Sequence, residues 1–133
     1  MTHAQAVAIE GVAGNRLASA LATVTGVERA LVATLEGELV AAEPAVDGTE
    51  AGREAALATF VAKRAEALST DGDLRGMGRL LAASRLERVT ISSDGGETLL
   101  YAPGSCYVLV SLRRGIPVAV SGPALEQVLR RYV

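Results

Sequence analysis

Two β-hairpin signals limit what this chain can fold into more than any other feature of its sequence. In ALVATLEGELVAAE, residues 30–43, two apolar arms flank Glu36-Gly37-Glu38, and Gly37 suits a tight turn. In RLERVTISSDGGETLLYA, residues 85–102, two alternating arms flank Asp94-Gly95-Gly96. Strands joined by such short turns pair antiparallel, so the sequence predicts a largely antiparallel sheet.

Five strands follow from this pattern, and two of them are apolar on both faces. Both alternating sets are apolar in Val27–Leu35, and Cys106–Leu112 is almost continuously apolar. Strands of this kind are covered on both sides, so we expect helices on both faces of the sheet and Cys106–Leu112 in its middle. The five strands are expected at residues 27–35, 38–42, 86–93, 97–102 and 106–112.

Helical spacing of apolar residues predicts helices at Ala13–Thr23, at Glu50–Leu68 and from Pro123 onward. The fold class is therefore α/β in the broad α+β sense, with one mainly antiparallel five-stranded sheet and the order α-β-β-α-β-β-β-α. We assign residues 14–133 to one domain. Residues 1–13 form an N-terminal extension that is either flexible or part of the first helix.

The stretch after the second helix leaves the length of that helix open. A helical spacing continues through Leu74, Met77 and Leu81, but two intervening glycines weaken it on propensity. The sequence does not decide whether the second helix runs straight through Gly72–Gly78.

Composition and charge exclude several classes of function. The 133 residues include one Phe, three Tyr and no Trp, which argues against aromatic stacking sites. Thirteen basic and fifteen acidic residues give a net charge of −2, too balanced for a binder of the nucleic-acid backbone. No signal-peptide pattern and no apolar window of membrane-spanning length is present. We expect a cytoplasmic protein without a membrane span, and the single Cys106 is compatible with a reducing compartment.

Residues for catalysis and metal binding are scarce. The one histidine is His3, so neither a His-based triad nor a His-rich metal site can be built. Cys106 opens an apolar strand without an imidazole to activate it, which favours a buried structural thiol over a nucleophile. The glycines of DLRGMGRLL lack the strand that precedes a phosphate-binding loop. Acidic pairs such as Asp71 with Asp73 are typical of turns and lack the spacing of a metal site. The sequence predicts no enzyme, no cofactor and no metal.

The second helix carries a stripe of alanines beside its larger apolar residues. A stripe of small side chains lets another helix approach closely, which favours a helix–helix dimer contact. Alanine is also abundant in this chain and favoured in any helix, so the stripe has an equally good explanation without a partner. If the contact exists, the residues expected in it, with an exposed edge strand at residues 86–93 beside it, are Ala51, Ala55, Ala58, Ala62, Ala65, Val89 and Ile91.

The order and spacing of these elements resemble a known family. VTGVERALVATLEGELVAAEP, Val24 to Pro44, looks like the opening of roadblock/dynein-light-chain domains, in which a helix ends at a glycine and a strand, a glycine turn and a second strand follow. The long alanine-rich helix, RLERVTISSDGGETLLYAPGSCYVLVSL from Arg85 to Leu112, and a terminal helix continue the likeness over the chain after about Gly14. The resemblance implies a roadblock/profilin-like fold.

The resemblance also implies a function. Members of this family are non-enzymatic homodimers that pair their second helices and edge strands, and bacterial MglB-like members associate with small Ras-like GTPases and alter their nucleotide cycle. On that basis we expect a homodimeric GTPase regulator or adaptor. Its candidate partner contacts, which also suit a merely solvated helix face, are Arg53, Glu54, Lys63, Arg64 and Glu66.

Other classes of function stay open at the level of sequence. A pure scaffold or assembly subunit without a GTPase partner also needs only a dimer and a free surface. A profilin-like or PAS-like sensor of small molecules would need a sizeable pocket with inward polar groups, for which this aromatic-poor sequence offers little. An enzyme would need carboxylates brought together in a way that the sequence does not show.

Overall fold

The computed structural model describes residues 11–45, 48–69 and 88–132. The elements appear in the predicted order, as α1 (Gly11–Ala22), β1 (Val27–Ala33), β2 (Leu39–Glu43), α2 (Gly48–Ser69), β3 (Arg88–Ser93), β4 (Gly96–Tyr101), β5 (Tyr107–Leu112) and α4 (Val118–Tyr132). His3, Asp71, Asp73, Leu74, Met77, Leu81 and the stretch Gly72–Gly78 lie outside the described residues.

The five strands form one sheet in the order β2-β1-β5-β4-β3. Every neighbouring pair is antiparallel, which confirms the sheet predicted from the two hairpins. As expected from its continuous apolar character, β5 lies in the middle, while β2 and β3 form the two edges. The observed strand limits differ from the expected ones by no more than two residues.

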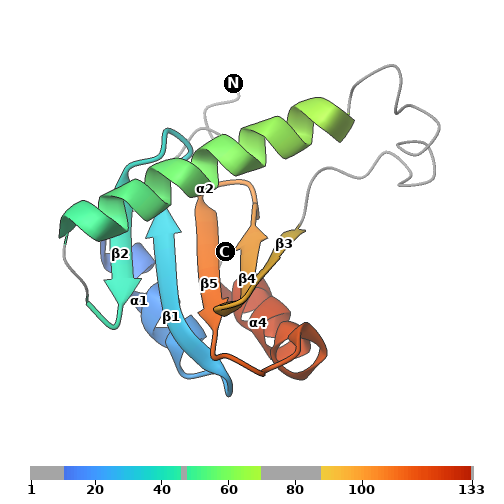
Figure 1. The fold of residues 1–133 in the computed structure, drawn as a ribbon. Coiled ribbons are helices and arrows are strands. Elements are labelled where there is room, and N and C mark those ends of the chain that lie inside the picture. Colours follow the sequence, from blue (N-terminus) through green and yellow to red (C-terminus); the bar gives the residue numbers. More distant parts are fainter. Residues whose placement is uncertain (1–10, 46–47, 70–87, 133) are drawn as a thin grey trace.

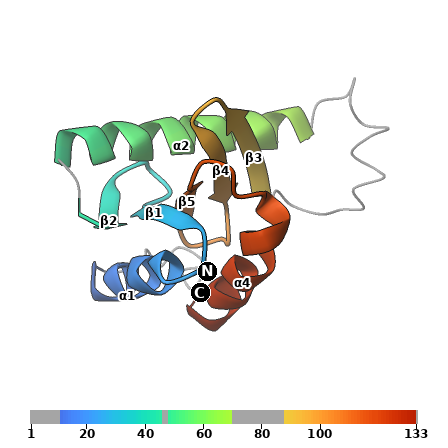
Figure 2. The same cartoon turned by 60° about the horizontal axis from the view of Figure 1, so that its bottom comes forward.

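Helices cover both faces of the sheet, as the strand composition predicts. α2 crosses one face, and α1 and α4 lie on the other (Figures 1 and 2). The alternation in β1 explains this arrangement, because Ala30 and Val32 belong to the core beneath α1 and α4. Leu31 and Ala33 belong instead to the core beneath α2.

The first helix begins earlier than its sequence suggests. α1 starts at Gly11 and includes Gly14, which is buried. A Cβ placed at residue 14 would collide with the Val40 side chain on β2. The glycine that weakens the helix on propensity is therefore what lets α1 approach the edge strand of the sheet.

The last helix also begins earlier than predicted. We expected Pro123 to open it, but α4 starts at Val118 and carries Pro123 inside. Pro117 immediately precedes the helix, and its carbonyl accepts a hydrogen bond from the Val120 amide. The early start places Ser121 in the core, where its hydroxyl donates to the Thr25 carbonyl at 2.7 Å.

The turn of the first hairpin packs against the second helix. Gly37 has a φ of +94°, which a glycine adopts without strain, and a Cβ there would lie 3.2 Å from the Thr59 hydroxyl. Thr34 holds the turn, since its hydroxyl accepts from the Glu38 amide at 3.0 Å and its own amide donates to the Glu38 carbonyl at 2.8 Å. The hairpin thus both starts the sheet and supports α2.

Candidate interaction surface

The alanine stripe of α2 faces the protein's own sheet. Ala51 and Ala55 pack with Leu31 and Ala33, and Ala58 and Ala62 pack with Leu100 and Tyr107. All four alanines are buried within the single chain, and Ala65 is half-buried. In this chain the small side chains bring the helix close to the strands, so they leave no free face there for a second helix.

The exposed face of α2 instead carries larger apolar side chains. Leu57 is 61% exposed and Phe60 is 62% exposed, while Val61 is half-buried between this face and the sheet. Large side chains left in water on one helix face are typical of a surface that binds another protein. The sequence placed these residues on one helical face, but it could not show which face the sheet would cover.

The edge strand β3 continues this surface at one side of the sheet. β3 pairs only with β4, so its outer backbone groups have no neighbouring strand within the described residues. Val89 packs towards the core beneath α2, whereas Ile91 is 39% exposed. An edge of this kind is open to pairing with another strand.

The predicted partner residues on α2 fall into different environments. Arg53, Lys63 and Arg64 are exposed. Glu54 is not free, because both its carboxylate oxygens contact Nη2 of Arg29 on β1 in a part-buried ion pair. Glu66 lies in α2, with its side chain outside the described residues.

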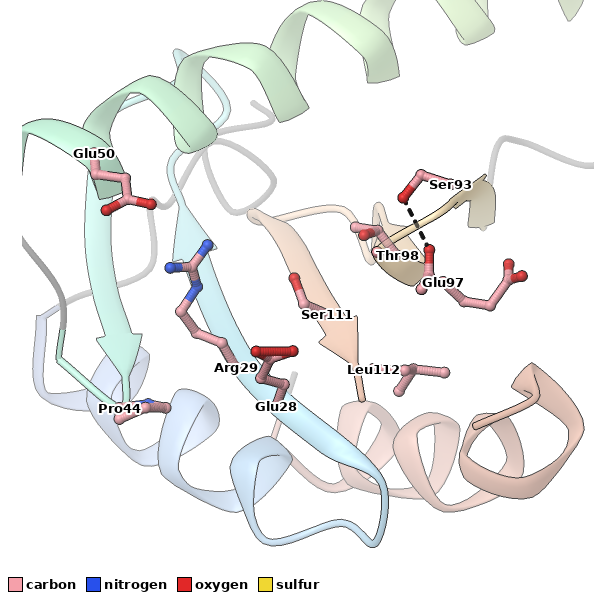
Figure 3. Close-up of a pocket in the computed structure, with 11 residues that line it drawn as sticks. Glu28, Arg29, Pro44, Glu50, Ser93, Glu97, Thr98, Ser111 and Leu112 are labelled. Carbon is pink, nitrogen blue, oxygen red and sulfur yellow. Dashed lines mark hydrogen bonds between the residues drawn. The ribbon is translucent and has the colours of Figure 1, made fainter. Parts of the chain in front are cut away.

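An open groove of about 450 Å³ lies beside this ion pair, between α2 and the end of the sheet that the helix does not cover (Figure 3). Three of its lining residues, Arg29, Ser111 and Thr98, belong to one row of paired residues across the sheet, because Arg29 faces Ser111 and Ser111 faces Thr98. Thr98 in turn faces Ile91 on β3, outside the groove. The next row of the sheet, beneath α2, is apolar instead. That row is Leu31, Leu109, Leu100 and Val89.

Carboxylates dominate the charge of this groove. Glu28, Glu50 and Glu97 line it together with Arg29. The Arg29 charge is already balanced by Glu54, so the groove is acidic on balance. Sequence reasoning missed this site, although Glu28 and Arg29 were a signal, since they are the charged pair in an otherwise apolar strand.

The Cys106 thiol and the Tyr101 side chain are both buried. Cys106 is fully buried as a free thiol, and burial raises its pKa, the opposite of what a nucleophile needs. Burial also raises the pKa of the Tyr101 phenol, with the nearby Arg88 acting against it. No group of three or more His, Cys, Asp or Glu within the described ranges could hold a metal ion. None of the helices in those ranges has both the length and the apolar character to cross a bilayer.

The described residues thus form a small antiparallel sheet between helices, with an exposed apolar helix face and an acidic groove on one side. No protein-family model and no curated protein matches the sequence. Solved structures do match. One is the Roadblock/LC7 domain from Streptomyces avermitilis, with a TM-score of 0.70 at 18% identity over 88% of this chain and 92% of that chain.

Two further matches are MglB proteins. A structure of MglB with a tetrameric arrangement has a TM-score of 0.70 at 14% identity and covers 95% of this chain and 91% of that chain. The gliding protein MglB from Thermus thermophilus has a TM-score of 0.64 at 12% identity, covering 93% of this chain and 89% of that chain. The chain therefore has the roadblock fold, as its resemblance to that family implies.

Proposed function

We propose that this protein is a non-enzymatic, homodimeric regulator or adaptor of a small Ras-like GTPase that acts through protein contacts. The observation that carries the proposal is the exposed apolar face of α2, with Leu57 and Phe60 in water, on a roadblock fold shared with MglB. In a monomer these apolar side chains stay in contact with water, whereas in a dimer bound to its partner they would be covered.

The two kinds of contact would use different parts of this surface. In the dimer, α2 and β3 of each copy meet, and Leu57, Val61 and Ile91 make the contact that was expected of the alanine stripe. The GTPase contacts exposed side chains on the outer side of α2. We keep the exposed Arg53, Lys63 and Arg64 as candidates for that contact and add Phe60. Glu54 is removed, because Arg29 already holds it.

A domain of this kind can change nucleotide turnover without reactive groups of its own. The rate of GTP hydrolysis depends on how the GTPase positions its switch segments and the attacking water. A bound protein can order those segments and so alter turnover. The scarcity of activated groups in the described residues is compatible with this indirect mode of action.

The test is a pull-down from the soluble extract of the native host, with GDP and separately with a non-hydrolysable GTP analogue. Recovery of a Ras-like GTPase in one nucleotide state, identified by mass spectrometry, would support the proposal. The purified pair would then be assayed for nucleotide turnover, with Phe60→Ala and Arg53→Ala as contact variants and Arg131→Ala on α4 as the control. Recovery of large structural partners without a GTPase would favour the scaffold alternative instead.

A further inference from the structure

The face of the sheet opposite α2 carries a different charge. α1 and α4 form one layer there, on the far side of the sheet from α2 (Figure 2). Their described residues include four charged side chains, which are Arg16, Glu126, Arg130 and Arg131. The Glu126 carboxylate lies 3.4 Å from Nη1 of Arg88 on β3 and 4.0 Å from Nη2 of Arg130. The layer therefore keeps an excess of positive charge, although the whole chain has a net charge of −2.

The loop before α4 extends this basic layer. Arg113 and Arg114 are both exposed. The Arg113 amide donates to the Gly26 carbonyl at 2.8 Å, which holds the loop beside the turn between α1 and β1. Within the described ranges, the ion pairs leave four arginines of this face without a carboxylate, and these are Arg16, Arg113, Arg114 and Arg131.

Exposed apolar side chains lie among these arginines. On α1, Val12 is 66% exposed and lies one helical turn before Arg16. On α4, Val120 is 56% exposed and opens a stripe of exposed residues that recur at intervals of three and four, so they share the outward side of the helix. The stripe is made of Val120, Pro123, Gln127 and Arg131. The outward side of the layer thus mixes guanidinium groups with apolar side chains.

We propose that this face binds the surface of an anionic membrane, with its arginines at the lipid phosphates and with Val12 and Val120 at the boundary of the acyl chains. Guanidinium groups bind phosphate oxygens in bidentate geometry. Cationic side chains interleaved with exposed apolar ones are typical of helices that lie on a bilayer without crossing it. The valines favour a bilayer over an acidic protein segment, because carboxylates match the arginines but not the apolar side chains between them.

The inference goes beyond the proposed function, and the proposed homodimer would strengthen it. If two copies join through α2 and β3, one sheet continues into the other, and the two layers of α1 and α4 point in the same direction. Two weak sites linked in this way bind a surface more tightly than either alone. A single copy already carries the whole layer, so a monomer should bind the membrane as well, with lower affinity.

The first experiment is cosedimentation of the whole chain with vesicles made of equal parts of phosphatidylcholine and phosphatidylglycerol. We expect binding that falls as salt is added, and no binding to pure phosphatidylcholine. Arg130→Gln combined with Arg131→Gln should weaken binding about twentyfold, since each arginine near an anionic surface contributes about fivefold. The matched control, Arg53→Gln combined with Lys63→Gln on α2, removes the same charge from the other face. It should change binding by about twofold or less, because salt screens charges on the far side of the protein.

The second experiment shows which face meets the lipid. The chain has no tryptophan, so a single introduced tryptophan reports on its own surroundings by fluorescence. Val120→Trp places this probe on α4, and Phe60→Trp places it at a position that is 62% exposed on α2. We expect anionic vesicles to shift the emission of Val120→Trp to shorter wavelength, because the indole enters the membrane interface, and to leave that of Phe60→Trp unchanged. Circular dichroism of each variant checks that the fold is kept.

The outcomes separate this inference from the proposed function. A wild-type chain that stays unbound by anionic vesicles at low salt overturns the inference and leaves an acidic protein as the occupant of this face. Equal binding to both kinds of vesicle, or equal loss in the two double variants, also overturns it. So does an emission shift in Phe60→Trp alone, which would place the α2 face on the membrane. Vesicle binding without recovery of a GTPase supports the inference and contradicts the proposed function, and the reverse result does the opposite.

Discussion

At the scale of single residues, Gly14 decides how closely α1 lies against the sheet. A methyl group at this position would overlap the Val40 side chain on β2, and neither element can move without disturbing the core beneath α1 and α4. Overpacking of this kind costs about 1–3 kcal/mol. We therefore expect Gly14→Ala to lower the free energy of unfolding by about that amount in urea denaturation.

Gly52 on α2 is the matched control. It is also a helical glycine, but a Cβ there would have no neighbouring atom within 4 Å. Gly52→Ala should stabilise the protein by about 0.5–1 kcal/mol, the ordinary gain from replacing glycine inside a helix. Shifts of opposite sign would establish close approach as the role of Gly14, whereas stabilisation by both variants would contradict it.

Cys106 makes stability depend on pH in the alkaline range. Burial raises the pKa of the folded thiol, while the thiol of the unfolded chain ionises near its usual value of about 8.5. Above that pH the unfolded state loses a proton that the folded state keeps, so stability falls as pH rises towards the folded pKa. The slope is at most about 1.4 kcal/mol per pH unit.

The measurement is urea denaturation at several pH values between about 7.5 and 9, below the range in which most of the tyrosine ionises. Cys106→Ala should remove most of the fall with pH, whatever its effect on absolute stability. The same slope in wild type and variant would show that another group is responsible.

At the scale of elements, Ser121 joins the start of α4 to the loop between α1 and β1. Its hydroxyl is buried and donates to the Thr25 carbonyl at 2.7 Å. In Ser121→Ala that carbonyl loses its side-chain donor, which costs about 1–3 kcal/mol if water cannot reach it. Ser92, which donates to Glu97 at 2.7 Å on the exposed β3, is the control.

We expect Ser121→Ala to lower the melting temperature measurably and Ser92→Ala to leave it almost unchanged, because water replaces an exposed hydrogen bond at little cost. Native-state hydrogen exchange would show which element is destabilised, since the α4 amides should exchange faster in Ser121→Ala. Unchanged α4 exchange would show that this hydrogen bond does not hold the helix.

The sequence predicts an element well when the residues that determine it lie close together along the chain. The strands, their antiparallel pairing and the central place of β5 follow from alternation and turn residues, which act over a few positions. The start of α4 does not, because Pro117 and Pro123 are both acceptable near a helix N-terminus and only the burial of Ser121 decides between them.

The interaction surface shows the same limit more clearly. The alanine stripe of α2 and the larger apolar residues beside it are both visible in the sequence. Which of the two meets the sheet depends on how closely the helix lies over Leu31 and Leu100, and this distance is set by the whole fold. The alanines pack against the strands, and Leu57 and Phe60 therefore lie on the exposed side of the helix. The acidic groove depends on residues from α2 and several strands, and no local pattern joins them.

At the scale of the whole molecule, the two faces should differ in what they bind, and Leu57 and Val120 allow a direct comparison. Leu57 on α2 is 61% exposed and Val120 on α4 is 56% exposed, on opposite faces of the sheet. Both side chains already contact water, so an arginine at either position should leave the fold intact. If the α2 face forms the dimer, only one of these changes places a charge in an apolar contact.

We expect Leu57→Arg to weaken dimerisation about a hundredfold, the effect of losing a central apolar contact in an interface. Val120→Arg should leave the dimer unchanged, and both variants should keep the wild-type melting temperature of a dilute, monomeric sample. Light scattering across a concentration series measures the first quantity and thermal denaturation the second. If Val120→Arg dissociates the dimer and Leu57→Arg does not, the dimer forms through the α1 and α4 face, and the α2 surface is left free for the GTPase alone.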